Sequence, residues 1–230
     1  MKKARFYGHG LPGMQKLTFP GKLIVIEGTD GVGRSTHINL LHDWLESKGR
    51  GVVVTGLTRS PLIGAGLQSA KESKLLGRQT MSLFYATDFA DRLEHEIIPA
   101  LRAGFVVLAD RYVYTLIVRD IVRGIDGDWL RKSYGFALVP DLAIYLSVDI
   151  DTLVARVLRA GTLKYWEAGM DLGLADNLFD SFLAYQSRLL EEFETISEEF
   201  KVPRISSKGT IRAVQTRLRK KIQRSFSDLA

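Results

Sequence analysis

The stretch Gly28-Thr29-Asp30-Gly31-Val32-Gly33-Arg34-Ser35-Thr36 decides the fold of this 230-residue chain. It has the frame of a phosphate-binding loop, Gly-x4-Gly-Lys-Ser/Thr, with Arg34 in place of the lysine. An apolar run, Lys22–Glu27, precedes the loop, and a helical pattern that ends near Lys48 follows it. Strand, glycine-rich turn and helix are the context in which this motif predicts phosphate binding. A glycine-rich turn without a ligand is the alternative interpretation.

The chemistry expected of this loop follows from its residue types. Its glycines allow backbone N–H groups to point inward around a phosphate, and the following helix presents its positive end to the same anion. We therefore expect residues 28–36 to contact nucleotide phosphates, with the Arg34 guanidinium reaching the terminal ones. The hydroxyl of Ser35 is placed to bind Mg²⁺, and Thr36 is expected to line the phosphate site.

The composition limits the class of protein. Hydrophobic residues at 46% and charged residues at 25% are ordinary for a globular protein. The chain has no cysteine, which excludes disulfides and thiolate metal sites, and its 4 histidines lack metal-ligand spacing. No apolar run approaches the length of about 18 residues that a membrane span needs. The basic N-terminus is not followed by an apolar segment, so we expect no signal peptide and predict a cytoplasmic protein.

The net charge of +6 raises the question of a nucleic-acid partner. The densest basic cluster, Arg217–Arg224, lies in the last predicted helix, where cations complement the helix dipole and aid solubility. No nucleic-acid-binding motif or aromatic-studded basic groove accompanies it. We therefore expect small anionic substrates, and neither a nucleic-acid nor a membrane partner.

Short apolar runs alternate with amphipathic segments from residue 22 onward, which predicts an α/β fold with a parallel sheet. Residues 1–20 are rich in glycine and proline and are expected to form an irregular N-terminal arm, with residues 21–230 forming one domain. The predicted strands are 23–27, 51–55, 105–109, 142–148 and 202–205. The predicted helices are 35–48, 81–102, 114–123, 129–136, 151–159, 177–200 and 211–226.

Two short motifs follow predicted strands, where ligands bind in open α/β sheets. Asp110 of Asp110-Arg111-Tyr112 can hold Mg²⁺, and the adjacent Arg111 can grip an anion with its planar guanidinium. The alternative is that this pair only closes the strand end. Arg59 follows the second strand and is placed to bind an acceptor phosphate, although a surface turn nucleated by Pro61 would have the same sequence.

A basic segment between residues 156 and 175 has the composition of a lid. Arg156 and Arg159 are three residues apart on a predicted helix, and a glycine-containing loop with Lys164 follows them. Such an element can close over phosphates, supply cations and exclude water. An exposed loop with solvated arginines is the alternative.

Together these residues resemble the thymidylate kinase family of P-loop nucleoside monophosphate kinases, from about Lys22 to the C-terminus. The resemblance is carried by the segments 26–31, 58–61, 83–88, 98–101 and 110–112. It implies a three-layer α/β/α P-loop fold with a five-stranded parallel sheet. It also implies an enzyme that uses ATP and Mg²⁺ to phosphorylate dTMP or a related mononucleotide, and a homodimer formed through the helix 81–102.

The resemblance also implies roles for individual residues. The expected catalytic residues are Asp30, Arg34, Arg111 and Arg159. The expected acceptor-binding residues are Arg59, Phe84, Asp88, Phe89, Arg111, Tyr112 and Thr115. The lid residues would be Arg156, Arg159 and Lys164, and the metal residues Ser35 and Asp110.

Several departures from the family pattern fall around the site. Besides Arg34, Phe89 stands where the family has an arginine that reads the thymine ring, and residues 115–120 differ from the family segment that holds the acceptor base. Ser60 replaces a glutamate, and Lys164 begins an altered lid motif. Two alternatives therefore stay open: the same fold with another acceptor (a nucleoside, another phosphometabolite or polyphosphate), or a degenerate nucleotide-binding module.

Overall fold

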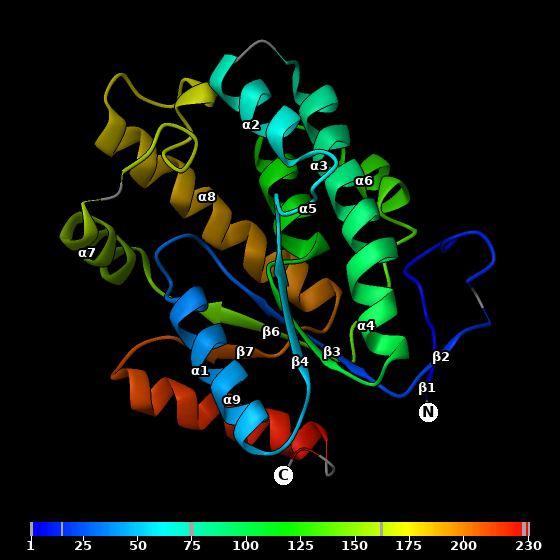
Figure 1. Cartoon of the computed structure of the whole chain (residues 1–230). Coiled ribbons are helices and arrows are strands. Elements are labelled where there is room, and N and C mark those ends of the chain that lie inside the picture. The colour runs from blue at the N-terminus through cyan, green and yellow to red at the C-terminus, as the bar shows by residue number, and fades with distance from the viewer. Residues whose placement is uncertain (1, 15, 74–75, 162, 227–228, 230) are drawn as a thin grey trace.

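The computed structural model describes residues 2–14, 16–73, 76–161, 163–226 and 229. At its centre lies a parallel sheet of five strands in the order β4-β5-β3-β6-β7 (Figure 1). The strands are β3 (Lys22–Glu27), β4 (Val52–Gly56), β5 (Val106–Asp110), β6 (Leu142–Ser147) and β7 (Arg204–Ser206). The predicted five-stranded parallel sheet of a P-loop fold is confirmed.

The central strand β3 shows why the sheet needs helices on both faces. Leu23 and Val25 belong to the apolar cluster on one face, and Ile24 and Ile26 belong to the cluster on the other face. All four side chains are fully buried. Since side chains alternate along a strand, a continuous apolar run of this kind must be covered twice.

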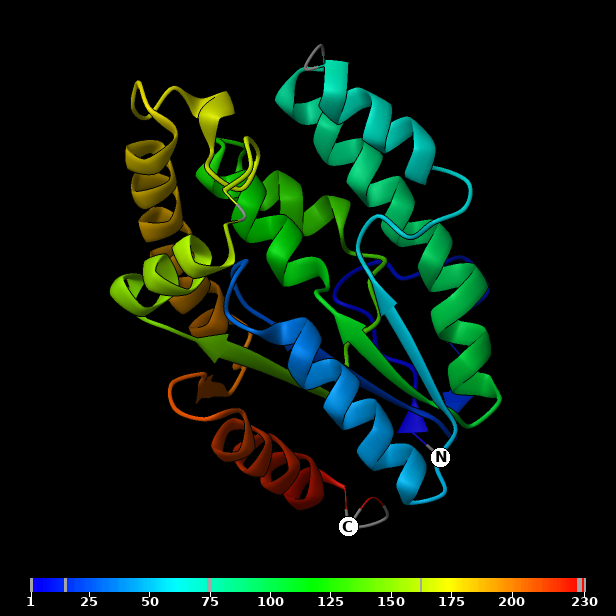
Figure 2. The ribbon, with the colours of Figure 1, turned by 60° about the vertical axis from the view of Figure 1, so that its left-hand side comes forward.

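Helices cover each face of the sheet, which gives the three-layer arrangement (Figure 2). One apolar cluster includes residues of α3 (Arg78–Arg92), α4 (Ile98–Arg102), α5 (Val113–Val122), α6 (Gly127–Ser133) and α8 (Leu178–Glu199). The other includes residues of α1 (Arg34–Ser47), α7 (Ile150–Ala160) and α9 (Ile211–Ser225). No helix in the described part of the chain combines the length and apolarity that crossing a membrane requires.

The long helix expected at 81–102 is divided into three segments. Between α3 and α4, residues Leu93–Ile97 form a π-helical turn, η1, and Pro99 lies at the start of α4. Proline lacks the N–H that an α-helix uses, so a wider turn before it is a physically reasonable adjustment. In the domain that follows the arm, α2 (Gly64–Ser73), which contains two glycines, and the short 3-10 turn η2 (Met170–Leu172) were not predicted.

The N-terminal arm is more ordered than its composition predicts. β1 (Lys2–Lys3) pairs antiparallel with β2 (Thr18–Phe19), and Phe6 forms an isolated bridge with Leu138. The side chain of Leu11 is buried. Contacts with distant residues thus supply local order in this arm that its composition does not indicate.

Candidate active site

The carboxyl ends of β4, β5 and β3 meet at one edge of the sheet. In the strand register, Asp110 pairs with both Ile26 and Gly56, so the loops that follow these strands lie side by side. In these loops Thr58 and Arg111 have φ angles of 61° and 72°, a strained conformation for residues with a side chain. Such strain is common in functional loops, and this edge is where open α/β sheets bind ligands.

The loop after β3 is shaped by glycines in backbone conformations that other residues rarely adopt. Gly31 has a φ of 79°, and a Cβ atom there would lie 2.7 Å from the side chain of Val157. Gly33, at φ 96°, is the N-cap of α1 and offers no side-chain cap to the first helical turn. The N–H groups of that turn therefore remain available, and together with the helix dipole they favour an anion at this position.

Arg34 lies beneath the loop and not over it. Its side chain is buried, and its Nη1 donates hydrogen bonds to the carbonyl oxygens of Gly28 and, at 2.5 Å, of Thr29. Its Nε donates to Oδ1 of Asp110 at 2.7 Å. The structure thus directs the guanidinium to the backbone of the loop, where its several donors bind groups that a lysine could not bind together.

Ser35 and Asp110 form the pair of oxygen ligands expected for a metal. Ser35 Oγ donates a 3.1 Å hydrogen bond to Asp110 Oδ2, at the start of α1. In the described part of the chain no group of three or more His, Cys, Asp or Glu residues could hold a metal. This donor set fits Mg²⁺ rather than zinc, because Mg²⁺ commonly uses few protein oxygens together with substrate phosphates.

Asp30, in the same loop, is surrounded by arginines. Its Oδ1 contacts Arg111, its Oδ2 accepts a hydrogen bond from Arg119, and Arg34 Nη2 lies 3.8 Å from Oδ1. Burial and the nearby Arg119 lower the pKa of Arg111 to about 9, so the guanidinium stays charged at neutral pH. The cluster thus places two cations next to the phosphate loop: Arg111, directly after β5, and Arg119, on α5.

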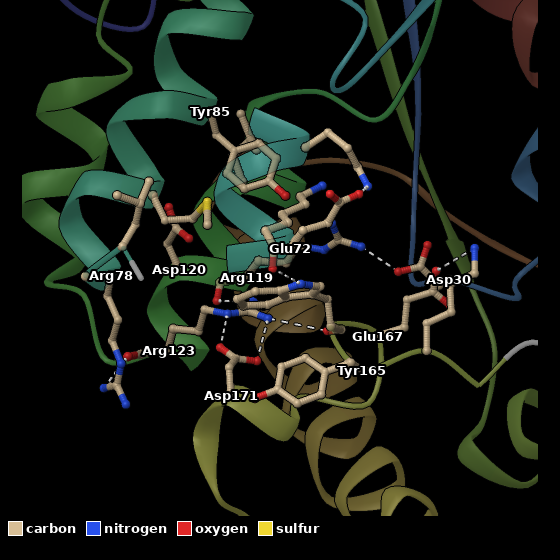
Figure 3. A pocket seen from close by; sticks show the side chains of 18 of the residues that line it. Asp30, Glu72, Arg78, Tyr85, Arg119, Asp120, Arg123, Tyr165, Glu167 and Asp171 are labelled. Carbon is tan, nitrogen blue, oxygen red and sulfur yellow. Dashed lines mark hydrogen bonds and ion pairs between the residues drawn. The ribbon is translucent and has the colours of Figure 1, made fainter. Parts of the chain in front are cut away.

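A cavity of about 780 Å³ opens beside this cluster (Figure 3). It lies between α2, α3, α5 and the loop that precedes η2. On each helix the lining residues recur at helical spacing and therefore share one face. They are Gln68, Lys71 and Glu72 on α2, Arg78, Met81 and Tyr85 on α3, and Leu116, Arg119 and Asp120 on α5, with Arg123 directly after that helix.

Asp120 is the buried carboxyl group of this cavity. It is 7% exposed, and Ser82 Oγ donates a 2.5 Å hydrogen bond to its Oδ2. Burial raises the pKa of Asp120 to about 6, although the bond from Ser82 and the charges of Arg123 and Arg119 act in the opposite direction. The carboxyl is therefore largely ionised at neutral pH.

Arg123, at the end of α5, holds η2 beside the cavity. Its Nε donates to Asp171 Oδ2 at 2.9 Å, and its Nη1 donates to the hydroxyl of Tyr185 on α8. On the other side of the cavity, Trp166 Nε1 donates to the carbonyl of Lys71 on α2 at 3.2 Å. Gln186 Nε2 on α8 also donates to the carbonyl of Glu167 at 2.8 Å, so the segment from Trp166 to Asp171 is connected to α2, to α8 and to Arg123; Figure 3 shows Arg123 joined to Asp171.

The chain was compared with known proteins. Residues 26–217 match the family model described as thymidylate kinase. The chain is 42% identical over 180 residues to "Probable thymidylate kinase 2" of Saccharolobus solfataricus, covering 78% of this chain and 84% of that protein. The chain belongs to the thymidylate kinase family. It is therefore an ATP-dependent phosphotransferase of the nucleoside monophosphate kinase type.

More distant members of this thymidylate kinase family show the same relation. "Probable thymidylate kinase" of Pyrococcus horikoshii is 33% identical over 158 residues, covering 66% of this chain and 77% of that protein. "Thymidylate kinase" of Akkermansia muciniphila is 34% identical over 165 residues, covering 70% of this chain and 79% of that protein. The match to the family model begins at residue 26, so the N-terminal arm lies outside it.

Three residues that this family member was expected to use for the acceptor lie in the core. Phe89 is fully buried, with its ring centroid 4.8 Å from that of Tyr112, and neither residue lines the cavity. Thr115 is buried as well, and its N–H and hydroxyl bond to Glu27. These three side chains are buried and are not among the residues that line the cavity.

The loop after β4 is held by another expected acceptor residue. Asp88 is fully buried and accepts 3.0 Å hydrogen bonds from the backbone N–H groups of Thr58 and Ser60. It thereby fixes the loop that carries Arg59, which is exposed and does not line the cavity. Phe84 is half-buried and lies beside Gly66 of α2.

The expected lid residues separate in the structure. Arg156 donates to the carbonyl of Val32 at 3.1 Å and to that of Ser207 at 2.8 Å, on the outer side of the phosphate loop. There it lines a second pocket of about 240 Å³ together with Thr36. Arg159 is exposed, and only Lys164 of the three lines the large cavity.

Arg119, Asp120 and Arg123 are cavity residues that the sequence did not single out. A signal was present in the spacing of Leu116, Arg119, Asp120 and Arg123, which places three charged residues on one stripe of a predicted helix. The helix is otherwise strongly apolar, so such a stripe must face either solvent or a polar cavity.

Proposed function

We propose that this chain transfers the γ-phosphoryl group of ATP to dTMP, with the acceptor bound in the 780 Å³ cavity. The observation that carries this proposal is the position of the cavity. Asp30 and Arg111 line it and also adjoin the phosphate loop, so a mononucleotide in the cavity would have its phosphate next to the donor. The names of the curated relatives support dTMP as the acceptor.

The loop 28–36 would bind the donor phosphates through its backbone N–H groups and the first turn of α1. Ser35 and Asp110 would hold Mg²⁺, which when bound neutralises charge on the phosphate oxygens. Arg34 would act on the donor side through the loop, since its side chain bonds the carbonyls of Gly28 and Thr29. Phosphoryl transfer requires chiefly positioning and charge neutralisation, which these residues supply.

Arg111 and Arg119 would hold the acceptor phosphate, and Asp30 would keep both guanidinium groups in place. Their charge would act in a site with little water, where it has a large effect on a transferring phosphoryl group. Arg59 would reach this site from the loop after β4, and Lys164 and Arg159 would complete it when the segment 156–175 closes.

The donor base would occupy the 240 Å³ pocket on the outer side of the loop. Val32, Gly33 and Thr36 connect this pocket directly to the phosphate site, and Arg156 and Ser207 form its opposite wall. Donor and acceptor would thus approach the loop from opposite sides, which an in-line transfer requires.

Two further proposals concern the domain division of the chain and its oligomeric state. Residues 21–230 would form one domain with residues 1–20 as an arm packed on it. Two copies of the chain would associate through α3, where Leu83 is 49% exposed on the surface of the helix. Sedimentation of the purified chain tests the dimer, because Leu83→Glu should shift a dimer toward monomer.

A coupled assay of ADP release across the common nucleoside monophosphates tests the function. We expect turnover with dTMP that requires ATP and is abolished by EDTA. In the variant Arg111→Gln, phosphorylation of the acceptor should be lost. The same variant should still bind a fluorescent ATP analogue, because Arg111 is proposed to hold the acceptor and not the donor. Absence of turnover with every mononucleotide, despite ATP binding, would contradict the proposed function.

A further inference from the structure

The N-terminal arm precedes the residues that match the family model, yet it is packed into the core of the domain. Its strand β2 lies beside α4 (Figure 1). Ala4, Leu11 and Phe19 are buried and belong to the apolar cluster that includes residues of α3, α5 and α8. This burial accounts for the attachment of the arm, whereas its polar contacts lead to the start of α5.

One of these polar contacts reaches α5 directly. The hydroxyl groups of Tyr7, in the arm, and Tyr114, in the first turn of α5, share a hydrogen bond. Tyr114 is buried, and the Tyr7 ring packs edge-on against Phe200 with the ring centroids 5.2 Å apart. Because packing fixes the Tyr7 ring, its hydroxyl holds Tyr114 in a defined direction.

A second contact reaches the same region through the chain around Leu138. The carbonyl of Arg5 accepts a 2.7 Å hydrogen bond from the N–H of Val139, and Phe6 forms a bridge with Leu138. The carbonyl of Leu138 in turn accepts a 2.9 Å hydrogen bond from the hydroxyl of Tyr112. The arm therefore also constrains Tyr112, the residue that precedes α5.

Both contacts end beside the arginines proposed to hold the acceptor phosphate. Tyr112 directly follows Arg111, whose φ of 72° is a strained conformation that persists only where the surroundings hold it. Tyr114 lies in the helix that carries Arg119, and both guanidinium groups contact Asp30 of the phosphate loop. The placement of the start of α5 therefore decides where the two cations point.

We propose that Tyr7 is a positioning residue for phosphoryl transfer. By holding Tyr114, it fixes the start of α5 so that Arg111 and Arg119 face the acceptor phosphate. Tyr7 acts only through α5, because no described residue of the arm lines the cavity. The inference rests on the proposed function, since it takes the two arginines as ligands of the acceptor phosphate.

The variant Tyr7→Phe tests this role, because it removes the shared hydrogen bond and keeps the ring that packs on Phe200. In steady-state kinetics the KM for dTMP should rise about fivefold, as for one lost hydrogen bond, and the KM for ATP should stay unchanged. Thymidine lacks the phosphate, so its inhibition constant as a competitor of dTMP should also stay unchanged. A general loosening of the cavity would instead weaken dTMP and thymidine alike.

Two further tyrosine variants complete this test. Tyr114→Phe should reproduce the changes, and the double variant should be no weaker than either single variant, since all three lose the same bond. Tyr145→Phe is the matched control, because the buried hydroxyl of Tyr145 has no hydrogen-bond partner among the described residues. It should leave the KM for dTMP unaltered. An unchanged KM for dTMP in folded Tyr7→Phe, or an equal loss of affinity for thymidine, would overturn the inference.

Amide hydrogen exchange measures the same contact without any turnover. In Tyr7→Phe the amides of residues 112–119 should exchange faster than in the wild type, and those of α9 should not. Unchanged exchange at residues 112–119 would overturn the inference.

Failure of the proposed function has a different signature, since the wild type would then phosphorylate no mononucleotide at all. Equilibrium titration with dTMP would in that case decide the role of Tyr7. Weaker binding to Tyr7→Phe than to the wild type would support it. Equal affinity, or no binding to the wild type, would overturn it.

Discussion

Arg34 donates a 2.7 Å hydrogen bond from Nε to Oδ1 of Asp110, while Ser35, the next residue, donates to the other oxygen of the same carboxylate. One carboxylate at the end of β5 thus holds both the loop arginine and the expected metal ligand on α1. Because Arg34 also bonds two loop carbonyls, the phosphate loop and β5 are joined through a single buried side chain.

The first prediction concerns Arg34→Lys. A lysine ammonium cannot reach Asp110 and both loop carbonyls together, so we expect the free energy of unfolding to fall by about 1–3 kcal/mol. Turnover should be retained within about tenfold, because the positive charge stays beneath the phosphate loop, whereas Arg34→Ala should lower kcat by about a hundredfold or more. Denaturant melts and coupled kinetics measure both effects. Arg212→Lys, on the exposed side of α9, is the control, and equal stability of the two lysine variants would disprove the anchoring role of Arg34.

A second prediction concerns Glu27, a fully buried carboxyl at the end of β3 that bonds to Tyr112 and Thr115 at the start of α5. Burial raises its pKa from 4.5 to about 7, despite these hydrogen bonds and the charge of Arg34. The folded protein therefore binds this proton more tightly than the unfolded chain does. Its contribution to stability is complete below pH 4.5 and is lost as the pH rises to about 7.

The measurement is the free energy of unfolding at several pH values between 4.5 and 7, for the wild type and for Glu27→Gln. Over this interval the wild type should lose about 3 kcal/mol more than the variant, since one pKa unit corresponds to about 1.4 kcal/mol. The glutamine can still accept from the two N–H groups, so the variant should fold. Parallel pH profiles for the two proteins would show that Glu27 does not titrate in this range.

The third prediction addresses the contact between Arg123 and Asp171. Asp171→Ala removes the carboxylate that binds η2 to Arg123 at the end of α5, so amides of η2 and of the loop before it should exchange hydrogen faster. The KM for the acceptor should rise about fivefold to tenfold, with a smaller change in kcat, because the loop closes the cavity. Glu199→Ala breaks a comparable pair with Arg131 on an exposed surface and should change neither quantity. Identical exchange in the two variants would contradict a role in closure.

A fourth prediction separates the core side of α3 from its cavity side. Phe89→Ala should cost about 3–5 kcal/mol of stability, as expected for a buried aromatic ring, while Phe89→Leu should leave the acceptor KM unchanged in the folded protein. Tyr85→Ala should instead raise the acceptor KM with a smaller loss of stability, because this ring lines the cavity. A large change in the acceptor KM of Phe89→Leu would show that the ring reaches the ligand.

Much of the fold could be predicted because its signals are local. A buried parallel strand is a continuous apolar run, as in Leu23–Ile26, and the loop that follows it needs glycines whatever the rest of the chain does. α2 was missed because its glycines argue against a helix, and only its packing on α3 makes it one. The arm at residues 1–20 was predicted, but its short strands and its bridge to Leu138 were not, since this order comes from contacts with distant residues.

The sequence by itself determined the phosphate loop, the parallel sheet around it and the family to which the chain belongs. The tertiary structure decided which side chains face the cavity. On α3, Met81 and Tyr85 line the cavity, whereas Phe89, one turn after Tyr85, is buried in the core, and helical spacing alone does not distinguish them because residues four apart share a face. The same holds for Arg34, whose direction depends on Asp110, 76 residues away. Local spacing fixes the order and type of elements, but the direction of a side chain depends on the partners that the fold brings to it.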